Sequence, residues 1–167
     1  MSIVVEGSHG IYLASALSIV EEQKEVAWAG AADLVQIRDE LGWLMGRYIE
    51  TERPNQNGHI FPLVDIQKNI GTIVHMPLNM GHRERYIVGG YVAAELIYPT
   101  GSPVSADGVP DLNAFVETLA KFHRSIYSDE WNAVKAAHAE GACWQSMECV
   151  PASLTCMADG GCGLTFP

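Results

Sequence analysis

Three polar residues have the side-chain types that a hydrolytic site uses: Ser146, Glu148 and His82. Ser146 and Glu148 lie in a short, largely apolar segment that we expect to form a strand. Because side chains alternate between the faces of a strand, these two residues share one face, with Gln145 and Met147 on the other. Two polar residues on one face either line a cleft or form an ordinary solvent-exposed strand face, and spacing alone favours the second reading.

His82 follows Gly81 in a polar turn between two expected strands. A histidine can accept the proton of a serine hydroxyl because its ordinary pKa is near neutrality. It is the histidine of the chain that stands in a turn leading into a glycine-containing strand. The others are His9, His59, His75, His123 and His138.

A serine–histidine pair needs a third group that orients the imidazole. Glu148 and Asp159 follow the serine in the sequence, and Glu95 and Asp107 follow the histidine. The serine does not stand in the Gly-x-Ser-x-Gly elbow of α/β-hydrolases, which disfavours that class. The sequence also lacks a phosphate-binding loop, a dinucleotide-binding turn and a His-Glu-x-x-His zinc helix, so we expect no cofactor and no metal.

Four cysteines lie close to the end of the sequence, at Cys143, Cys149, Cys156 and Cys162. A disulfide framework would be spread through a small secreted fold, and the rest of this chain has no cysteine. Zinc sites usually contain a more closely spaced cysteine pair. Reduced thiols are therefore the favoured interpretation, and a zinc-binding module formed by these cysteines is an alternative.

The composition indicates a globular domain with a real core. The chain has 167 residues, of which 48% are apolar and 18% are charged. Its formal net charge of −10 would repel nucleic-acid phosphates and anionic membranes, so neither is an expected partner. No apolar run is long enough to span a bilayer, and no basic segment leads into a secretion signal. We expect a soluble cytoplasmic protein.

The elements that must position these side chains form a β-rich α+β domain. Helices are predicted over residues 11–32, 61–70, 112–125 and 129–140. Strands are predicted over residues 41–50, 73–79, 86–98, 143–150 and 153–156. Pro77 places its strand at an edge, and Gly89-Gly90 suggest a bulge or a close backbone approach. Residues 1–40 are expected to be a helical appendage to a main domain over residues 41–167.

Four segments follow one another in an informative order. They are a strand leading to an Asn-x-Asn-Gly turn (46–61), a Pro-x-Asn-x-x-His segment (77–82), an Ile-Val-Gly-Gly strand (87–94) and a helix–Gly–strand segment ending in Ser-Met-Glu (140–148). In order and spacing they resemble the prohead, or capsid maturation, proteases of tailed bacteriophages. These proteases are relatives of the herpesvirus assemblin serine proteases. The resemblance covers roughly residues 42–150.

The resemblance implies an assemblin-like barrel or sheet flanked by helices, with the protease domain over residues 41–167. It implies a serine endopeptidase that cleaves scaffold and capsid-protein segments, and itself, inside the procapsid in the host cytoplasm. Ser146 would be the nucleophile and His82 the general base, with backbone N–H groups stabilising the oxyanion. By the motif, Glu148 would be the third member of the triad, which orients the imidazole. Asp159 is the second candidate for that role.

Two other functions remain as alternatives to the protease. One is a non-catalytic capsid-assembly or scaffold-associated protein on the same fold. The other is the zinc-binding module described above. Self-association into a homo-oligomer is also left open.

Overall fold

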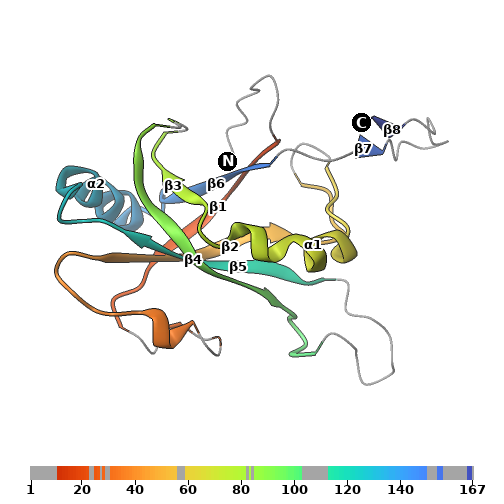
Figure 1. The fold of residues 1–167 in the computed structure, drawn as a ribbon, viewed down its shortest axis with the longest axis horizontal. Helices are drawn as coiled ribbons and strands as arrows, with labels where there is room; N and C mark the ends of the chain where they lie inside the picture. The colour runs from red at the N-terminus through yellow and green to blue at the C-terminus, as the bar shows by residue number, and fades with distance from the viewer. Residues whose placement is uncertain are drawn as a thin grey trace.

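The computed structural model describes residues 11–22, 25–26, 28, 31–55, 59–81, 83, 85–102, 113–149, 154–155 and 165–166 (Figure 1). For strand positions 11–15, 146–149, 154–155 and 165–166 only the backbone is described. All statements below refer to these residues.

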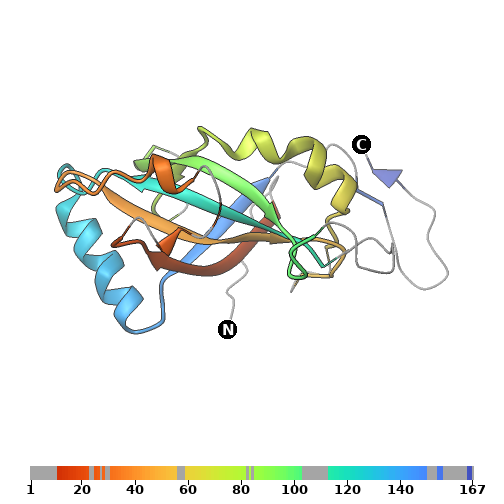
Figure 2. The same ribbon diagram turned by 90° about the horizontal axis from the view of Figure 1, so that it is seen from below.

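Six strands form one antiparallel sheet in the order β3-β4-β5-β2-β1-β6. They are β1 (Ile11–Ile19), β2 (Gly42–Glu50), β3 (Pro77–Asn79), β4 (Ile87–Ile97), β5 (Phe115–Phe122) and β6 (Trp144–Cys149). The other elements are the helices α1 (Leu63–Asn69) and α2 (Ser128–Ala139), the 3₁₀ turns η2 (Ala32–Leu34) and η3 (Ile70–Ile73), and the two-stranded ladder of β7 (Leu154–Thr155) and β8 (Thr165–Phe166). Figures 1 and 2 show α2 at one end of the long axis, away from α1.

The sheet is curled into a half-barrel. The Tyr91 hydroxyl of β4 donates a hydrogen bond to Gln145 Oε1 of β6 over 3.3 Å. These strands are four positions apart in the sheet order, which in a flat sheet is a separation of about 19 Å. The two side chains meet because the curl brings them together across the concave face.

Each face of the sheet packs against a different part of the chain. The concave face holds the larger core, to which α1 contributes Ile66, η3 contributes Ile73 and α2 contributes Trp131. On the convex face, side chains of residues 20–35 cover β2, β5 and β4 around Trp43 and Leu119. The convex face of β1 is not covered in this way, because Ala16 and Ser18 are exposed.

Two of the predicted helices are wrong. Residues 11–19 form β1, in which Leu17 and Ile19 pack in the concave core while Ala16 and Ser18 are exposed. This alternation has the two-residue period of a strand. Apolar side chains in the same segment also have three- and four-residue spacing, and that spacing is the reason why a helix was predicted. β1 is hydrogen-bonded between β2 and β6, so this part of the expected appendage belongs to the main sheet.

The helix expected over residues 112–125 is also a strand, β5. Phe115, Leu119 and Phe122 have the spacing of a helix, but the same segment also has a two-residue period, and pairing with β2 and β4 selects the strand. The side chains buried on its concave face are Val116, Thr118, Ala120 and Phe122.

The other major elements agree with the sequence. The predicted strands at 41–50, 86–98 and 143–150 and the two predicted helices α1 and α2 are confirmed. β3, which begins at Pro77, is an edge strand as expected. Gly141, with φ of 67°, follows the end of α2. The N-cap of this helix is Tyr127, and its side chain forms no capping hydrogen bond.

Candidate active site

Ser146 and Glu148 lie in β6, the edge strand next to β1. In the β1–β6 ladder Ser146 is opposite Ala14 and Glu148 is opposite Tyr12. The two positions therefore share one strand face with Trp144, whose side chain is 51% exposed. The opposite face carries Gln145, which is 4% exposed. Ser146 and Glu148 thus fall on the outer face of the half-barrel.

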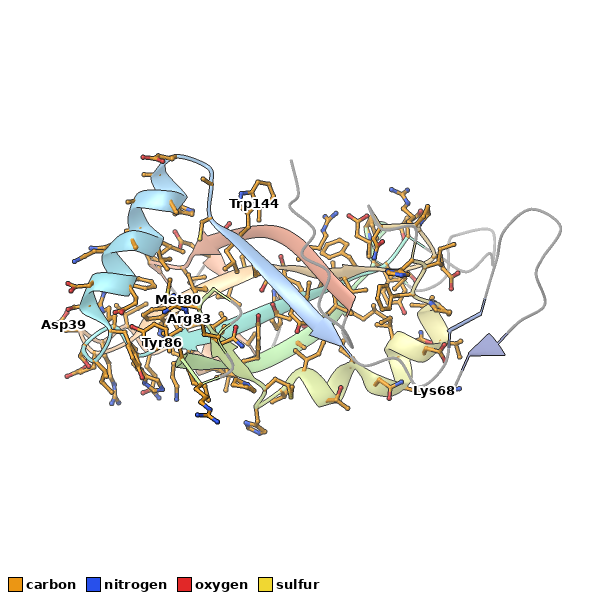
Figure 3. The ribbon with its side chains drawn as sticks, turned by 90° about the horizontal axis from the view of Figure 1, so that it is seen from above. Asp39, Lys68, Met80, Arg83, Tyr86 and Trp144 are labelled. Atoms are coloured by element: carbon orange, nitrogen blue, oxygen red, sulfur yellow. The ribbon has the colours of Figure 1, made fainter. Side chains whose placement is uncertain are left out.

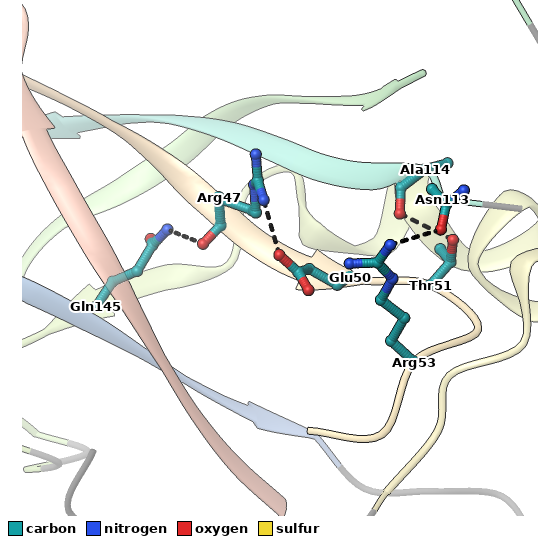
Figure 4. A network of polar contacts seen from close by, with 7 residues as sticks. All are labelled: Arg47, Glu50, Thr51, Arg53, Asn113, Ala114 and Gln145. Atoms are coloured by element: carbon teal, nitrogen blue, oxygen red, sulfur yellow. Dashed lines mark hydrogen bonds and ion pairs between the residues drawn. The ribbon is translucent and has the colours of Figure 1, made fainter. Parts of the chain in front are cut away.

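Gln145 fixes which face of β6 points into the core (Figure 4). Its Nε2 donates to the Arg47 carbonyl of β2 over 3.1 Å, and its Oε1 accepts from the Tyr91 hydroxyl. Burial raises the pKa of Tyr91 far above its ordinary value, so this hydroxyl stays protonated and can donate. A Cβ at Gly46 would come within 2.8 Å of Gln145 Nε2, so a glycine there leaves the space that the amide occupies. A shift of β6 by one residue would remove this amide from its partners.

We expect Gln145→Leu to destabilise the protein. The substitution leaves the buried Tyr91 hydroxyl without this acceptor and removes the bond from the amide to the Arg47 carbonyl, which together cost about 2 kcal/mol of the free energy of unfolding. Urea denaturation of the two proteins measures this loss.

The chain offers a matched control for this substitution. Gln67 of α1 also bonds a tyrosine hydroxyl, that of Tyr98, but the pair is exposed. Gln67→Leu should change the free energy of unfolding by less than about 0.5 kcal/mol. Equal losses for both variants would show that Gln145 does not hold β6.

His82 lies outside the described residues, in the connection between β3 and β4. The flanking backbone is a tight hairpin: Arg83 N–H donates to the Met80 carbonyl over 3.2 Å, and Tyr86 N–H donates to the Arg83 carbonyl over 2.8 Å. Gly81 has φ of 61°, a left-handed conformation that favours glycine.

Tyr86 anchors this hairpin to α2. Its hydroxyl donates a short hydrogen bond to the Glu130 carboxylate, and its ring packs edge-on against Tyr127. Figure 3 shows Met80, Arg83 and Tyr86 together beside α2. Because α2 leads directly into β6, one helix connects the hairpin that carries position 82 with the strand that carries position 146.

The Tyr86–Glu130 bond makes the hairpin anchor sensitive to pH. The hydrogen bond with Tyr86 holds the pKa of Glu130 below its usual value, and the same bond raises the pKa of Tyr86. The lowered carboxyl pKa contributes stability above the unfolded pKa, and this is lost as pH falls through the folded value. The raised phenol pKa contributes stability below 10.0, and this is lost as pH rises through the folded value.

We expect Tyr86→Phe to accelerate amide hydrogen exchange in the hairpin, residues 80–87, at neutral pH. The phenyl ring keeps the contact with Tyr127 but removes the bond to Glu130. In the unsubstituted protein the same loss of protection should appear when pH falls below the lowered pKa of Glu130 or rises above the raised pKa of Tyr86. Unchanged exchange in the variant would show that this bond does not hold the hairpin.

The remaining sequence candidates are placed as follows. Glu95 lies in β4 opposite Glu117 of β5, and Asp159 and Asp107 lie outside the described residues.

Cys143 is a buried free thiol, and burial raises its pKa. Of the other cysteines, Cys149 has only its backbone described, in β6, and the last two lie outside. Within the described part of the chain, no cluster of His, Cys, Asp and Glu could hold a metal ion.

Sequence reasoning missed the residues that position the site. Gln145 was assigned to the apolar face of its strand without a role, and its partners on β2 and β4 are distant in sequence. The available signal was a lone amide on a face that is otherwise apolar, since such a group must find buried partners. Nothing in the sequence indicated the contact between Tyr86 and Glu130.

Comparisons with known proteins give no relative. No family model matches the chain, and neither a curated protein nor a solved structure matches it. A search of the described helices finds none with the length and hydropathy needed to cross a membrane.

Proposed function

We propose that this protein is a serine endopeptidase of the prohead protease type, with Ser146 as nucleophile and His82 as general base. The observation that carries the proposal is the position of Ser146. It lies on the outer face of an edge strand, next to an exposed tryptophan, and the buried amide of Gln145 holds that strand in its register.

The four segments that resemble prohead proteases include β6 and three other strands of the same sheet. The first covers β2 from Gly46 onward and the loop after it, and the second and third cover the β3–β4 hairpin. The fourth begins directly after α2 and covers most of β6. The motif residues are thus parts of one curled sheet and of the connections next to its strands, which supports an assemblin-like half-barrel as the finer description of the fold.

The chemistry assigned to these residues is acyl transfer. Ser146 Oγ attacks the carbonyl carbon of the scissile peptide bond while His82 accepts the hydroxyl proton. Backbone N–H groups stabilise the oxyanion, and the imidazolium then protonates the amine that leaves. Water hydrolyses the acyl-enzyme with His82 again as base, which releases the carboxylate product and restores the serine.

Glu148 is the preferred partner of His82. It shares the strand face of Ser146 and lies about 7 Å along the strand from it, so an imidazole placed over both residues could contact each. Asp159 is the second candidate for this role.

The substrates proposed are extended segments of scaffold and capsid protein, and of the chain itself. An edge strand can receive an extended peptide as an added strand, which brings a scissile bond beside a side chain of that strand. The net charge of −10 suits an enzyme that works in the procapsid before DNA enters.

Labelling with a fluorophosphonate tests the nucleophile. The probe phosphonylates an activated serine and spares ordinary hydroxyl groups, so we expect one adduct per chain, located by mass spectrometry at Ser146. Labelling should be lost in His82→Ala, since the hydroxyl is then no longer activated. No adduct on the intact protein, or an adduct elsewhere, would favour a non-catalytic assembly protein.

A further inference from the structure

A cavity lies at the end of the sheet where β1 ends and β2 begins. It has a volume of about 250 Å³, and its lining comes from the end of β1, the segment leading into β2, the residues after β5 and helix α2. Its apolar walls belong to both cores, with Ile19 and Trp131 from the concave side and Val20, Leu41 and Trp43 from the convex side. The two cores therefore meet here without filling the space between them.

This cavity is separate from the proposed reaction site. Ile19 is five residues along β1 from Ala14, the residue opposite Ser146, which is a distance of about 17 Å. An inference drawn from the cavity therefore does not depend on the proposed function.

The walls of the cavity offer apolar contact to a ligand. Trp43 Nε1 donates to the Gln36 carbonyl over 3.0 Å, so the polar atom of this indole already has its partner. A Cβ at Gly42 would lie 2.5 Å from the Trp131 ring, so the glycine lets this second indole pack directly on the β2 backbone. Ile37 also belongs to the lining and is 58% exposed. An apolar ligand would cover this side chain and rest against two fixed rings.

Two of the three charged side chains of the lining are cationic, namely Arg124 and Lys135, and the third is Glu21. Arg124 Nε donates to the Asp39 carbonyl over 2.6 Å, and Arg124 Nη2 donates to the Arg38 carbonyl over 2.8 Å. These bonds fix the guanidinium, and among the described residues no acceptor is bound to its Nη1. A guanidinium held in this way is ready to donate to an added anion.

Lys135 supplies the positive charge that the lining does not neutralise. Asp39 Oδ1 lies 3.4 Å from Arg124 Nη2 and offsets part of the guanidinium charge. The Lys135 ammonium, by contrast, forms no ion pair with any residue that the structure describes. A cationic cavity stands out in a chain whose net charge is −10. A carboxylate that reaches both cations would gain charge-assisted hydrogen bonds, whereas Glu21 would repel a second negative charge.

We propose that this cavity binds a small monocarboxylic acid with an apolar body. Its volume equals that of about eight molecules of liquid water, which suits a ligand of about ten non-hydrogen atoms. The apolar body packs against Trp43 and Trp131, and the carboxylate accepts hydrogen bonds from Arg124 Nη1 and Lys135 Nζ.

NMR titration of the full chain with 3-phenylpropionate tests the inference. We expect saturable shifts of the backbone amides of residues 19–21, 37–43 and 131–135, with a dissociation constant of about 0.5 mM. The neutral 3-phenylpropanamide has nearly the same shape and should bind about fivefold more weakly, and propionate, which lacks the ring, should not saturate the site. Equal affinity for the acid and the amide, or no saturable shift in these segments, would overturn the proposal.

Charge variants of the lining provide the second test. Lys135→Met should weaken binding of 3-phenylpropionate about fivefold, and Glu21→Gln should strengthen it about twofold. Lys68→Met is the matched control, because Lys68 is an exposed lysine of α1 at the opposite end of the molecule from α2 (Figure 3). It should leave the affinity unchanged. All three side chains are exposed, so the variants should keep the fold. Equal affinities for Lys135→Met and Lys68→Met would contradict the proposal.

Discussion

Ser146→Ala is expected to abolish peptide-bond cleavage while leaving the fold intact. Removal of the hydroxyl takes away the only atom of this residue that can form the acyl-enzyme, so kcat should fall by about 10⁴-fold or more. The substitution removes one atom at a position whose register places it on the outer face of β6, so the midpoint of thermal unfolding should change little. Cleavage of co-expressed scaffold, followed by gel electrophoresis and mass spectrometry, measures the loss.

Ser18→Ala is the control for this prediction. Ser18 is an exposed serine on the outer face of β1, and the same substitution there should leave activity unchanged. Full cleavage by Ser146→Ala would show that the nucleophile is a different residue.

Gly89→Ala is expected to have the largest effect on stability. A Cβ at this position would lie 1.8 Å from the Lys121 carbonyl oxygen on the neighbouring strand β5, a distance that no pair of such atoms tolerates. The ladder between β4 and β5 must therefore separate locally, at a cost of about 3 kcal/mol or more in the free energy of unfolding. For a chain of this size, the midpoint of thermal unfolding should fall by about 10 °C.

Gly71→Ala is the matched control, because a Cβ there would meet no atom within 4 Å. It should be neutral or slightly stabilising, since alanine reduces the conformational freedom of the unfolded chain. Equal stability of Gly89→Ala and the unsubstituted protein would mean that β4 and β5 do not approach each other as described.

The elements predicted correctly are those in which the backbone preferences of the residues themselves favour the structure that is found. The Gly89-Gly90 pair suggested a bulge or a close approach of backbones, and the close approach is found at Gly89. The irregularity in the β4–β5 register falls later, between Tyr91 and Ala93. The edge position of the strand that begins at Pro77 was also predictable, because it follows from the backbone preference of a single residue.

The two missed strands show where local reasoning ends. In β1 and β5 the apolar residues fit both a helical and a strand period, and only hydrogen bonding to distant strands decides between them. The contacts around the candidate site are long-range for the same reason. Gln145 reaches Tyr91 and Arg47 because the sheet curls, and the curl is a property of the whole sheet.

Of the candidate site, the sequence supplied residue types and the shared face of Ser146 and Glu148. It did not indicate the two contacts that hold these elements in place. One is the hydrogen bond of the buried amide on β6, and the other is the hydrogen bond by which a tyrosine holds the β3–β4 hairpin against α2. Neither has a local signature, since each depends on a partner supplied by another element.

A crystal structure of the protein with a phosphonate bound to the nucleophile tests the central claim most directly. The proposal predicts that the phosphorus is bonded to Ser146 Oγ and that a ring nitrogen of His82 lies within about 3.2 Å of that oxygen. An ordered His82 more than about 5 Å from Ser146 Oγ, with its imidazole turned away, would contradict it.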